Sequence, residues 1–394
     1  GLAGLSAADE LRRAGHEVIV LEARDRIGGR VFSRELENGA VVEMGAEFIL
    51  PGNTLVRELA GELGLELWDK GMRYGRREPR GAGELAPDAL EVAIWTVDGA
   101  LADDPELGLL AAPDFLERLD IDDGARAVLI ARLEVSAASP ADGVPATALS
   151  GVAHIGDDPS PSVAGGNQRL ARALAEPLGS ALHLGTEVDR IAWSTDGVTV
   201  GAAGGEVTAD ACVIAVPATK VGELEFEPAL PAAVVGAIDG IRYGHAAKLF
   251  VPLASSAPAS AVMSVPERYW TWTSTGAGGG VQPVVNAFAG SAPALDRLRV
   301  GEGPEEWLKS LRALRPDLAL AEGDAVLSTW SDDPWVGAAY SILPGEETTT
   351  TLSEPVGRLT FAGEHTGGPF AGLMEGALRS GRRAAGVLSS GAGR

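Results

Sequence analysis

Apolar positions recur along the chain with two spacings, and each spacing predicts a different kind of element. Over residues 2–11, apolar residues recur roughly every three or four positions, which is typical of a helix with one buried face. Gly15 then stands where a helix cap is expected, and the apolar run over residues 16–21 predicts a buried strand that ends at Glu22. The chain is therefore predicted to open with a helix followed by a strand.

The same patterns place elements along the rest of the chain. Helices are predicted at residues 54–63, 86–97, 114–135, 303–314 and 373–388. The segment at residues 162–170 is predicted to open a further helix that runs to about residue 178. Strands are predicted at residues 182–185, 186–191, 211–216, within 241–251, and at 268–273, 281–289, 325–330 and 359–363. Hairpins are predicted at residues 31–42 and 198–207, the first around the turn dipeptide Asn38-Gly39.

Composition narrows the classes of function. The 394 residues carry a net charge of −23, which disfavours binding to nucleic acid or to anionic membrane surfaces. Cys212 is the one cysteine, so the chain cannot form an internal disulfide, and no Cys/His spacing typical of a metal site occurs. No long apolar run, signal peptide or hydrophobic tail is visible, so we expect a cytoplasmic protein without a membrane anchor. The sequence does not indicate an oligomeric state.

The turn at the start of the chain carries the first candidate chemistry. Gly1 would let the backbone approach a pyrophosphate, and Gly4 would let the helix pack closely on a sheet. Amides at the start of the helix would face the phosphates, and Glu22 would accept hydrogen bonds from a ribose diol. A turn before an ordinary helix has the same short pattern, so these residues alone leave both interpretations open.

Two longer segments carry a resemblance to a known family. The segment LEARDRIGGR at residues 21–30 and the segment FAGEHTGGPFAGLMEGALRSGRRAA at residues 361–385 are similar to signatures of the flavin-containing amine oxidase superfamily. This superfamily includes monoamine oxidases, polyamine oxidases and L-amino-acid oxidases. The resemblance extends over nearly the whole chain and is weakest at residues 68–160 and 250–330.

The resemblance implies an α/β fold with two discontinuous domains. One is a Rossmann-like FAD-binding domain of the glutathione-reductase type, expected from residues 1–67, 163–240 and 350–394. The other is an interleaved α+β substrate-binding domain, expected from residues 68–162 and 241–349.

The resemblance also implies which residues bind the cofactor. These are Gly1, Gly4, Glu22, Ala23, Arg24, Gly29, Arg30, Met44, Gly45, Ala46, Val188, Gly363, Glu364, Leu373 and Met374. Monoamine oxidases attach FAD covalently to a cysteine, and Ala339 stands at the matching position here. The expected cofactor is therefore non-covalent FAD.

In the family, a lysine on the strand that corresponds to residues 246–250 holds a water against flavin N5 and assists reaction with O2. Lys248 matches this position, although a single lysine on a strand is more often a solvated surface residue. The substrate pocket is expected to include Gln168, Tyr340, Phe370 and Leu373. Leu373 stands where monoamine oxidases have the second of two aromatic rings, so a complete two-ring cage is not expected.

The implied reaction is the oxidation of a small-molecule amine. A hydride passes to flavin N5, the imine hydrolyses, and O2 reoxidises the flavin to give hydrogen peroxide. No Ser/His/Asp nucleophile set is needed, and no metal is expected.

The chain begins inside the family's G-x-G-x-x-G turn. Gly1 and Gly4 match its second and third glycines, while the first glycine and the strand before it are not in the sequence, so we expect an N-terminally truncated chain. Two alternatives stay open. One is a related desaturase or dehydrogenase that acts on a non-amine substrate. The other is a chain that cannot hold FAD without its first strand.

Overall fold

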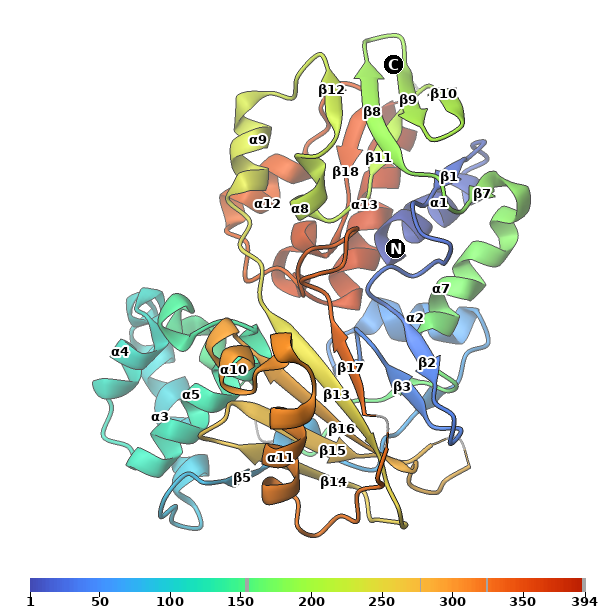
Figure 1. The fold of residues 1–394 in the computed structure, drawn as a ribbon. Coiled ribbons are helices and arrows are strands. Elements are labelled where there is room, and N and C mark those ends of the chain that lie inside the picture. Colours follow the sequence, from blue (N-terminus) through green and yellow to red (C-terminus); the bar gives the residue numbers. More distant parts are fainter. Residues whose placement is uncertain (153–155, 277, 324, 392–394) are drawn as a thin grey trace.

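The computed structural model describes residues 1–152, 156–276, 278–323 and 325–391. Its elements form two groups, one above the other in Figure 1, and the sequence colours show that the chain passes between them more than once. Residues 153–155 and 392–394, at or near the ends of two predicted domain segments, lie outside the described residues. The division into two discontinuous domains remains a prediction.

Two short pairs of parallel strands belong to the upper group. Strand β1 (Val20–Leu21) pairs with β7 (Leu182–His183), and β11 (Cys212–Ile214) pairs with β18 (Leu359–Phe361). Apolar faces of the surrounding helices pack together and against β1 and β7 in one buried cluster. These helices are α1 (Leu2–Arg13), α2 (Thr54–Glu62), α7 (Gln168–Ala175) and α13 (Met374–Gly391).

A four-stranded sheet lies at the top of Figure 1. Its order is β10 (Gly205–Ala209), β9 (Val198–Ala202), β8 (Val188–Trp193) and β12 (Glu225–Glu227). Helices α8 (Ala218–Val221), α9 (Ala232–Asp239) and α12 (Glu346–Ser353) contribute to its apolar cluster. Two further strand pairs are β2 (Ser33–Glu35) with β3 (Val41–Glu43) and β4 (Leu67–Trp68) with β6 (Ser162–Val163).

The described residues of the lower group form a six-stranded sheet with helices on both faces (Figure 1). Its order is β17 (Val326–Thr329), β13 (Ala246–Pro252), β16 (Val284–Gly290), β15 (Tyr269–Thr273), β14 (Ser260–Ser264) and β5 (Glu78–Arg80). The associated helices are α3 (Ala89–Asp103), α4 (Ala112–Glu117), α5 (Asp123–Ala137), α6 (Leu149–Val152), α10 (Ala292–Arg297) and α11 (Glu305–Leu314). Short 3-10 turns lie at Tyr74–Arg76, Pro105–Leu109, Ala141–Gly143, Ala146–Ala148, Glu176–Ala181, Val300–Glu302, Glu364–Thr366 and Gly368–Phe370.

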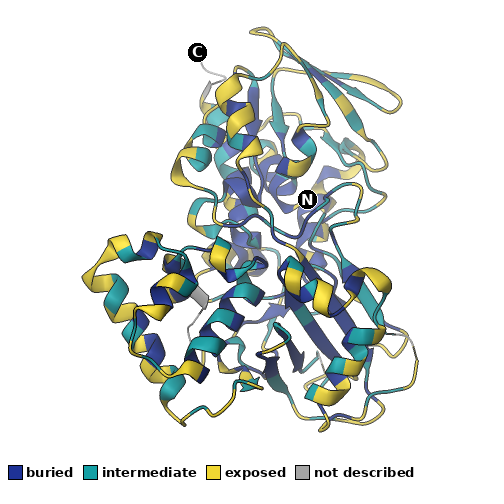
Figure 2. Cartoon of the chain, turned by 60° about the vertical axis from the view of Figure 1, so that its left-hand side comes forward, coloured by how far each residue is buried: buried dark blue, intermediate teal, exposed yellow. Residues whose placement is uncertain are grey.

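Strands β13, β15 and β16 of this sheet are almost entirely buried (Figure 2). Their residues alternate between two different surroundings. Leu249 and Ala287 face the cluster that contains Trp307 of α11. Trp270 and Trp272 face the opposite side and pack with α5. Because successive side chains of a strand point to opposite faces, Lys248 is turned away from the Leu249 face.

The structure confirms most of the predicted elements and corrects others. The helix predicted at residues 114–135 is two helices, α4 and α5, because Asp122 caps a new helix by accepting a hydrogen bond from the Ala125 amide. The strand predicted at residues 16–21 is regular only at Val20–Leu21. Strands β5 and β14 and helix α9 were not predicted, and β5 lies at a sheet edge where Pro79 is tolerated.

The close packing of α1 on α13 leads to the first testable prediction. A Cβ atom at Gly381 would lie 2.3 Å from the Ala3 carbonyl oxygen, whereas one at Gly386, on the same helix, would meet nothing within 4 Å. We expect Gly381→Ala to lower the free energy of unfolding by about 1–3 kcal/mol, because α1 must move away. Gly386→Ala is expected to raise it by roughly 0.5–1 kcal/mol, because alanine favours the helix. Urea unfolding of both variants tests this, and equal effects would contradict it.

Candidate functional site

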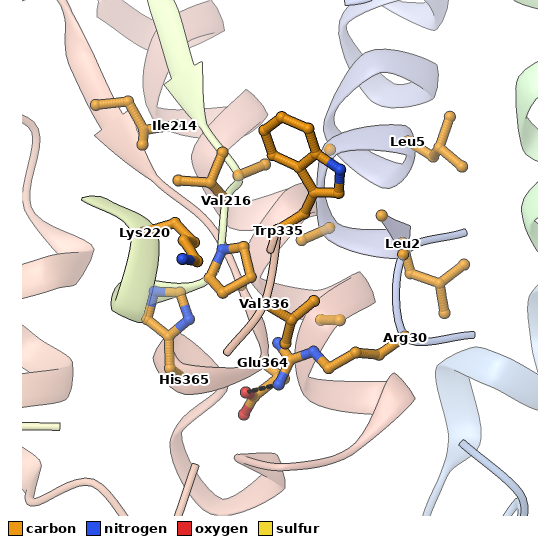
Figure 3. Close-up of a pocket in the computed structure, with 18 of the residues that line it drawn as sticks. Leu2, Leu5, Arg30, Ile214, Val216, Lys220, Trp335, Val336, Glu364 and His365 are labelled. Carbon is orange, nitrogen blue, oxygen red and sulfur yellow. Dashed lines mark hydrogen bonds and ion pairs between the residues drawn. The ribbon is translucent and has the colours of Figure 1, made fainter. Parts of the chain in front are cut away.

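A cavity of about 1980 Å³ is lined by residues of both groups of elements. Ligand pockets for drug-sized molecules usually measure about 300–1,000 Å³, so this cavity has room for a dinucleotide together with a second small molecule. Its walls come from α1, β1, β8 and β11 in the upper group and from β13 and β15 in the lower group. Figure 3 shows the part of the cavity between Leu2 and Leu5 of α1 and the segment around Ile214 and Val216.

Among the residues that line the cavity from the upper group of elements are Glu22 and Val188. The Glu22 amide donates to the His183 carbonyl, which continues the parallel pairing of β1 with β7 beyond Leu21. The Glu22 carboxylate accepts a hydrogen bond from the Arg24 amide at 3.1 Å, and its other oxygen lies 3.4 Å from the Gly1 nitrogen. An acidic side chain at a strand end beside the start of a helix suits a ribose diol next to a phosphate.

Glycines bring segments of the backbone close together around the cavity. A Cβ atom at Gly45 would lie 1.9 Å from the Arg30 carbonyl oxygen, and the Ala46 amide donates to that same oxygen at 3.1 Å. Gly29 has a φ of 59°, and a Cβ there would lie 3.3 Å from the Gly1 Cα. Because these glycines have no side chain, backbone atoms lie close together along the cavity wall and leave room for a flat, extended cofactor.

The half-buried Arg30 and the buried Glu364 form an ion pair on the cavity wall (Figure 3). Arg30 Nη1 donates to Glu364 Oε1 at 2.8 Å and to the Ala339 carbonyl at 2.8 Å. Burial alone would lower the pKa of Arg30, but the Glu364 carboxylate more than offsets this and raises it. The same carboxylate also accepts hydrogen bonds from the Ser341 hydroxyl and the Gly372 amide, so it joins three chain segments.

Lys248 of β13 lies on the cavity wall inside a buried cluster of charged groups. Its Nζ donates to Glu47 Oε2 at 2.7 Å and to the Glu43 carbonyl at 2.9 Å. Lys70 Nζ donates to the other Glu47 oxygen at 2.5 Å. Burial lowers the pKa of Lys248, and Glu47 offsets part of that effect. Lys248 is therefore a buried residue with protein partners, not a solvated surface lysine.

The Glu43 carboxyl is buried beside this cluster and accepts hydrogen bonds from the Asn167 amide and the Ser33 hydroxyl. Burial, followed by repulsion from Glu47, raises the pKa of Glu43 from 4.5 to about 7. The folded protein therefore holds this proton more tightly than the unfolded chain does. The resulting stabilisation is present below the unfolded pKa and is lost as the pH rises through 7.

This loss of stability with rising pH leads to a second prediction. Glu43→Gln keeps the shape and removes the titration, so its free energy of unfolding should fall less than that of the wild type between pH 5 and pH 8. We expect a difference on the order of 2 kcal/mol across this range. Glu35→Gln, at an exposed position of the same hairpin, serves as the control. Urea unfolding at several pH values measures both, and parallel pH profiles for Glu43→Gln and wild type would contradict the prediction.

Aromatic side chains form the wall of the cavity around Lys248. Trp270 and Trp272 stack with ring centroids 4.3 Å apart, and Phe48 and Tyr74 contact Trp270 at 5.5 and 5.4 Å. Tyr340 lies on the same cavity, and its hydroxyl donates to the Ser136 carbonyl at 2.9 Å. Burial raises the pKa of Tyr340, so this phenol stays neutral. The wall excludes water and favours an apolar or aromatic group.

The structure brings most of the predicted site residues together at this one cavity. All the residues predicted to bind the cofactor line it, as do Lys248, Tyr340 and Leu373. The described lining residues do not include Gln168 or Phe370. The Gln168 side chain donates to the Ile27 carbonyl at 3.0 Å, and the Phe370 ring lies 4.7 Å from the Arg379 guanidinium. This placement does not support direct substrate contact by either residue.

Several lining residues were not predicted from the sequence, among them Glu47, Phe48, Tyr74, Trp270 and Trp272. Glu47 and Phe48 directly follow Met44, Gly45 and Ala46, which were predicted to bind the cofactor, so their place in the sequence was the available signal. The two tryptophans alternate along β15, and a strand with large aromatic residues at alternate positions indicates one shared face.

Among the described residues, no group of three or more His, Cys, Asp and Glu side chains is arranged to hold a metal ion. None of the described helices combines the length and the apolar character needed to cross a membrane.

Comparisons with known proteins show to which family and fold this chain is similar. The family model "Flavin containing amine oxidoreductase" matches residues 2–81 and 69–389. Polyamine oxidase 4 of Oryza sativa subsp. japonica is 28% identical over 426 residues, which cover 98% of this chain and 86% of that protein. Wild-type putrescine oxidase bound to putrescine superposes with a TM-score of 0.84 at 22% identity, covering 99% of this chain and 97% of its own. Cyclohexylamine oxidase of Brevibacterium oxydans superposes with a TM-score of 0.82 at 23% identity, covering 100% and 98%. These two similarities establish the α/β fold that the sequence predicted.

Proposed function

We propose that this chain, which belongs to the family of flavin-containing amine oxidoreductases, oxidises a small-molecule amine with FAD as its cofactor and O2 as the electron acceptor. The amine loses a hydride and a proton to become an imine, which water hydrolyses to a carbonyl compound and ammonia or a smaller amine. O2 takes up the two electrons and two protons and leaves as hydrogen peroxide. Flavin-dependent oxidoreduction is the property of the family, and FAD, O2 and the amine are our proposal.

One observation carries this proposal. Residues from the two ends of the chain and from the middle line a single cavity, with Glu22 contributed by the upper group of elements and Lys248, beside the aromatic wall, by the lower sheet. When bound, FAD would supply the hydride acceptor and pass the electrons on to O2. Glu22 and the start of α1 suit its ribose and pyrophosphate, and the start of α13 suits the negative charge of a reduced flavin ring.

The other residues of the cavity bind and orient the amine. Hydride loss requires a neutral amine, and the aromatic wall of Phe48, Tyr74, Trp270 and Trp272 suits the apolar substituent of such an amine. Both oxygens of Glu47, the acidic residue within this wall, accept hydrogen bonds from lysines. We therefore propose a monoamine with an apolar or aromatic substituent in preference to a diamine.

The proposal that FAD is held without a covalent bond rests on the residues along the wall. Ala339, whose carbonyl accepts the Arg30 hydrogen bond, has no nucleophilic side chain. Cys212 is the one cysteine of the chain, and burial raises its pKa to about 11, which keeps the thiol protonated and unreactive. Denaturing the purified protein should therefore release all of its flavin, identified as FAD by mass.

Oxygen consumption with a panel of amines tests the function. We expect consumption and matching hydrogen peroxide with at least one aromatic or cyclic monoamine, and slower turnover with diamines of similar length. The alternative, a dehydrogenase acting on another substrate, would bind FAD but consume no O2 with any amine, and an artificial electron acceptor would then be needed for turnover.

A further inference from the structure

A buried chain of charges, Lys70–Glu47–Lys248, lies against the cavity. The side chains of its three members are 9%, 7% and 7% exposed. Glu47 stands at the centre, with one oxygen 2.5 Å from Lys70 Nζ and the other 2.7 Å from Lys248 Nζ. The residues come from three separate parts of the chain: the loops after β3 and β4, and strand β13.

The geometry leaves Glu47 little freedom. Its backbone carbonyl accepts hydrogen bonds from the Ser162 hydroxyl and the Asn167 side-chain amide, which fix the loop. Lys70 is fixed in turn, because its own carbonyl accepts the Thr275 amide and its ammonium lies 5.4 Å from the centre of the Phe48 ring. With one oxygen held by Lys70, the other is directed at Lys248.

The groups that face Lys248 come from every element packed against it. Strand β3 contributes Glu43 at its end, and the loop that follows contributes Glu47. The loop after β4 contributes Lys70, and β15 contributes the Trp272 ring at 5.8 Å. Phe288 of β16 and Ser328 of β17 stand opposite Lys248 in the sheet and carry no charge. Glu47 is thus the carboxylate in contact with the Lys248 ammonium, and Lys70 is the cation that opposes it.

We propose that Glu47 is a positioning residue that keeps Lys248 charged and aimed at the cavity, and that Lys70 holds Glu47 in the orientation this requires. A buried ammonium without a partner loses its proton readily, and an adjacent carboxylate reverses this tendency. Lys70 acts in two ways, because it orients Glu47 but also repels the Lys248 charge. The effect of this cluster on reaction with O2 rests on the proposed function, whereas the link between Glu47 and Lys248 does not.

The two neighbours of Lys248 should therefore shift its titration in opposite directions. In Glu47→Gln two lysines remain without their carboxylate, so the pH above which reoxidation by O2 slows should fall by about one unit or more. In Lys70→Met the charge that repels the Lys248 ammonium is removed, so the pH above which reoxidation by O2 slows should rise. Glu47→Asp keeps the charge on a shorter side chain and should restore part of the wild-type profile. Exposed Glu37→Gln is the control and should match the wild type.

A second measurement does not depend on activity. Urea unfolding of Glu47→Gln, Lys248→Met and the double variant forms a double-mutant cycle. We expect the double variant to lose clearly less stability than the sum of the two single losses, because either single change already removes the contact between Glu47 and Lys248. Additive losses, or pH profiles of Glu47→Gln and Lys70→Met that shift in the same direction, would overturn the proposal. Coupled stabilities without any amine-dependent turnover would keep the Glu47–Lys248 link and reject the proposed function alone.

Discussion

Replacing Lys248 by methionine is expected to slow reoxidation of the reduced protein by O2 about 100-fold or more, the usual effect of removing one preorganised electrostatic group. O2 acquires negative charge as it takes up electrons, and the Lys248 ammonium is a fixed positive charge on the cavity wall. Methionine has a similar length and no charge. Reduction by the amine should change little, because the aromatic wall that binds the substrate stays in place. Stopped-flow absorption separates the two half-reactions.

The control for this change is Lys309→Met on α11, which removes an exposed lysine paired only with Glu306 at the surface. It should leave both half-reactions unaltered. If Lys248→Met also left reoxidation unaltered, Lys248 would have no part in reaction with O2. The related dehydrogenase would then be the better description of this chain.

Replacing Arg30 by methionine is expected to lower the free energy of unfolding by about 3–5 kcal/mol, because it leaves the Glu364 carboxylate buried without its cation. Burial alone would raise the pKa of Glu364, but the opposing effects of its neighbours, chiefly the positive charge of Arg30, lower this pKa. The pair also joins the segments that contain Ala339, Ser341 and Gly372, so flavin retention should weaken as well. Urea unfolding and the flavin content after dialysis measure these two effects.

The double variant Arg30→Met/Glu364→Gln distinguishes a charge effect from a loss of packing. It buries no uncompensated charge, so it should be more stable than Arg30→Met alone. A double variant less stable than Arg30→Met would mean that shape at this point matters more than charge.

The fold and the cofactor-binding residues of the site could be predicted from the sequence because their signals are local. The spacing of apolar residues over 2–11 corresponds to α1, and the segments around Arg30 and Glu364 are long enough to be recognised one at a time. Arg30 and Glu364 are nevertheless 334 positions apart, and nothing in either segment predicts that they form an ion pair. The break between α4 and α5 had a local signal as well, since an aspartate such as Asp122 before an apolar run is a typical helix cap.

The charged cluster could not have been predicted in this way. Lys70 follows Asp69 in a stretch of mixed polarity, where a lysine is most often solvated. Its contact with Glu47 exists because β4 pairs with β6 and the loop after it returns to the lower sheet, which is a property of the tertiary fold. The same argument applies to Gln168, which was expected at the substrate pocket and whose side chain instead donates a hydrogen bond to the Ile27 carbonyl.

The most direct test of the whole account is the visible absorption spectrum of the purified protein before and after an amine is added without oxygen. We expect a flavin spectrum that bleaches with at least one monoamine and returns, with release of hydrogen peroxide, when air is admitted. A flavin spectrum that no amine bleaches would contradict the proposed reaction, and a protein that binds no flavin would contradict the proposed cofactor site as well.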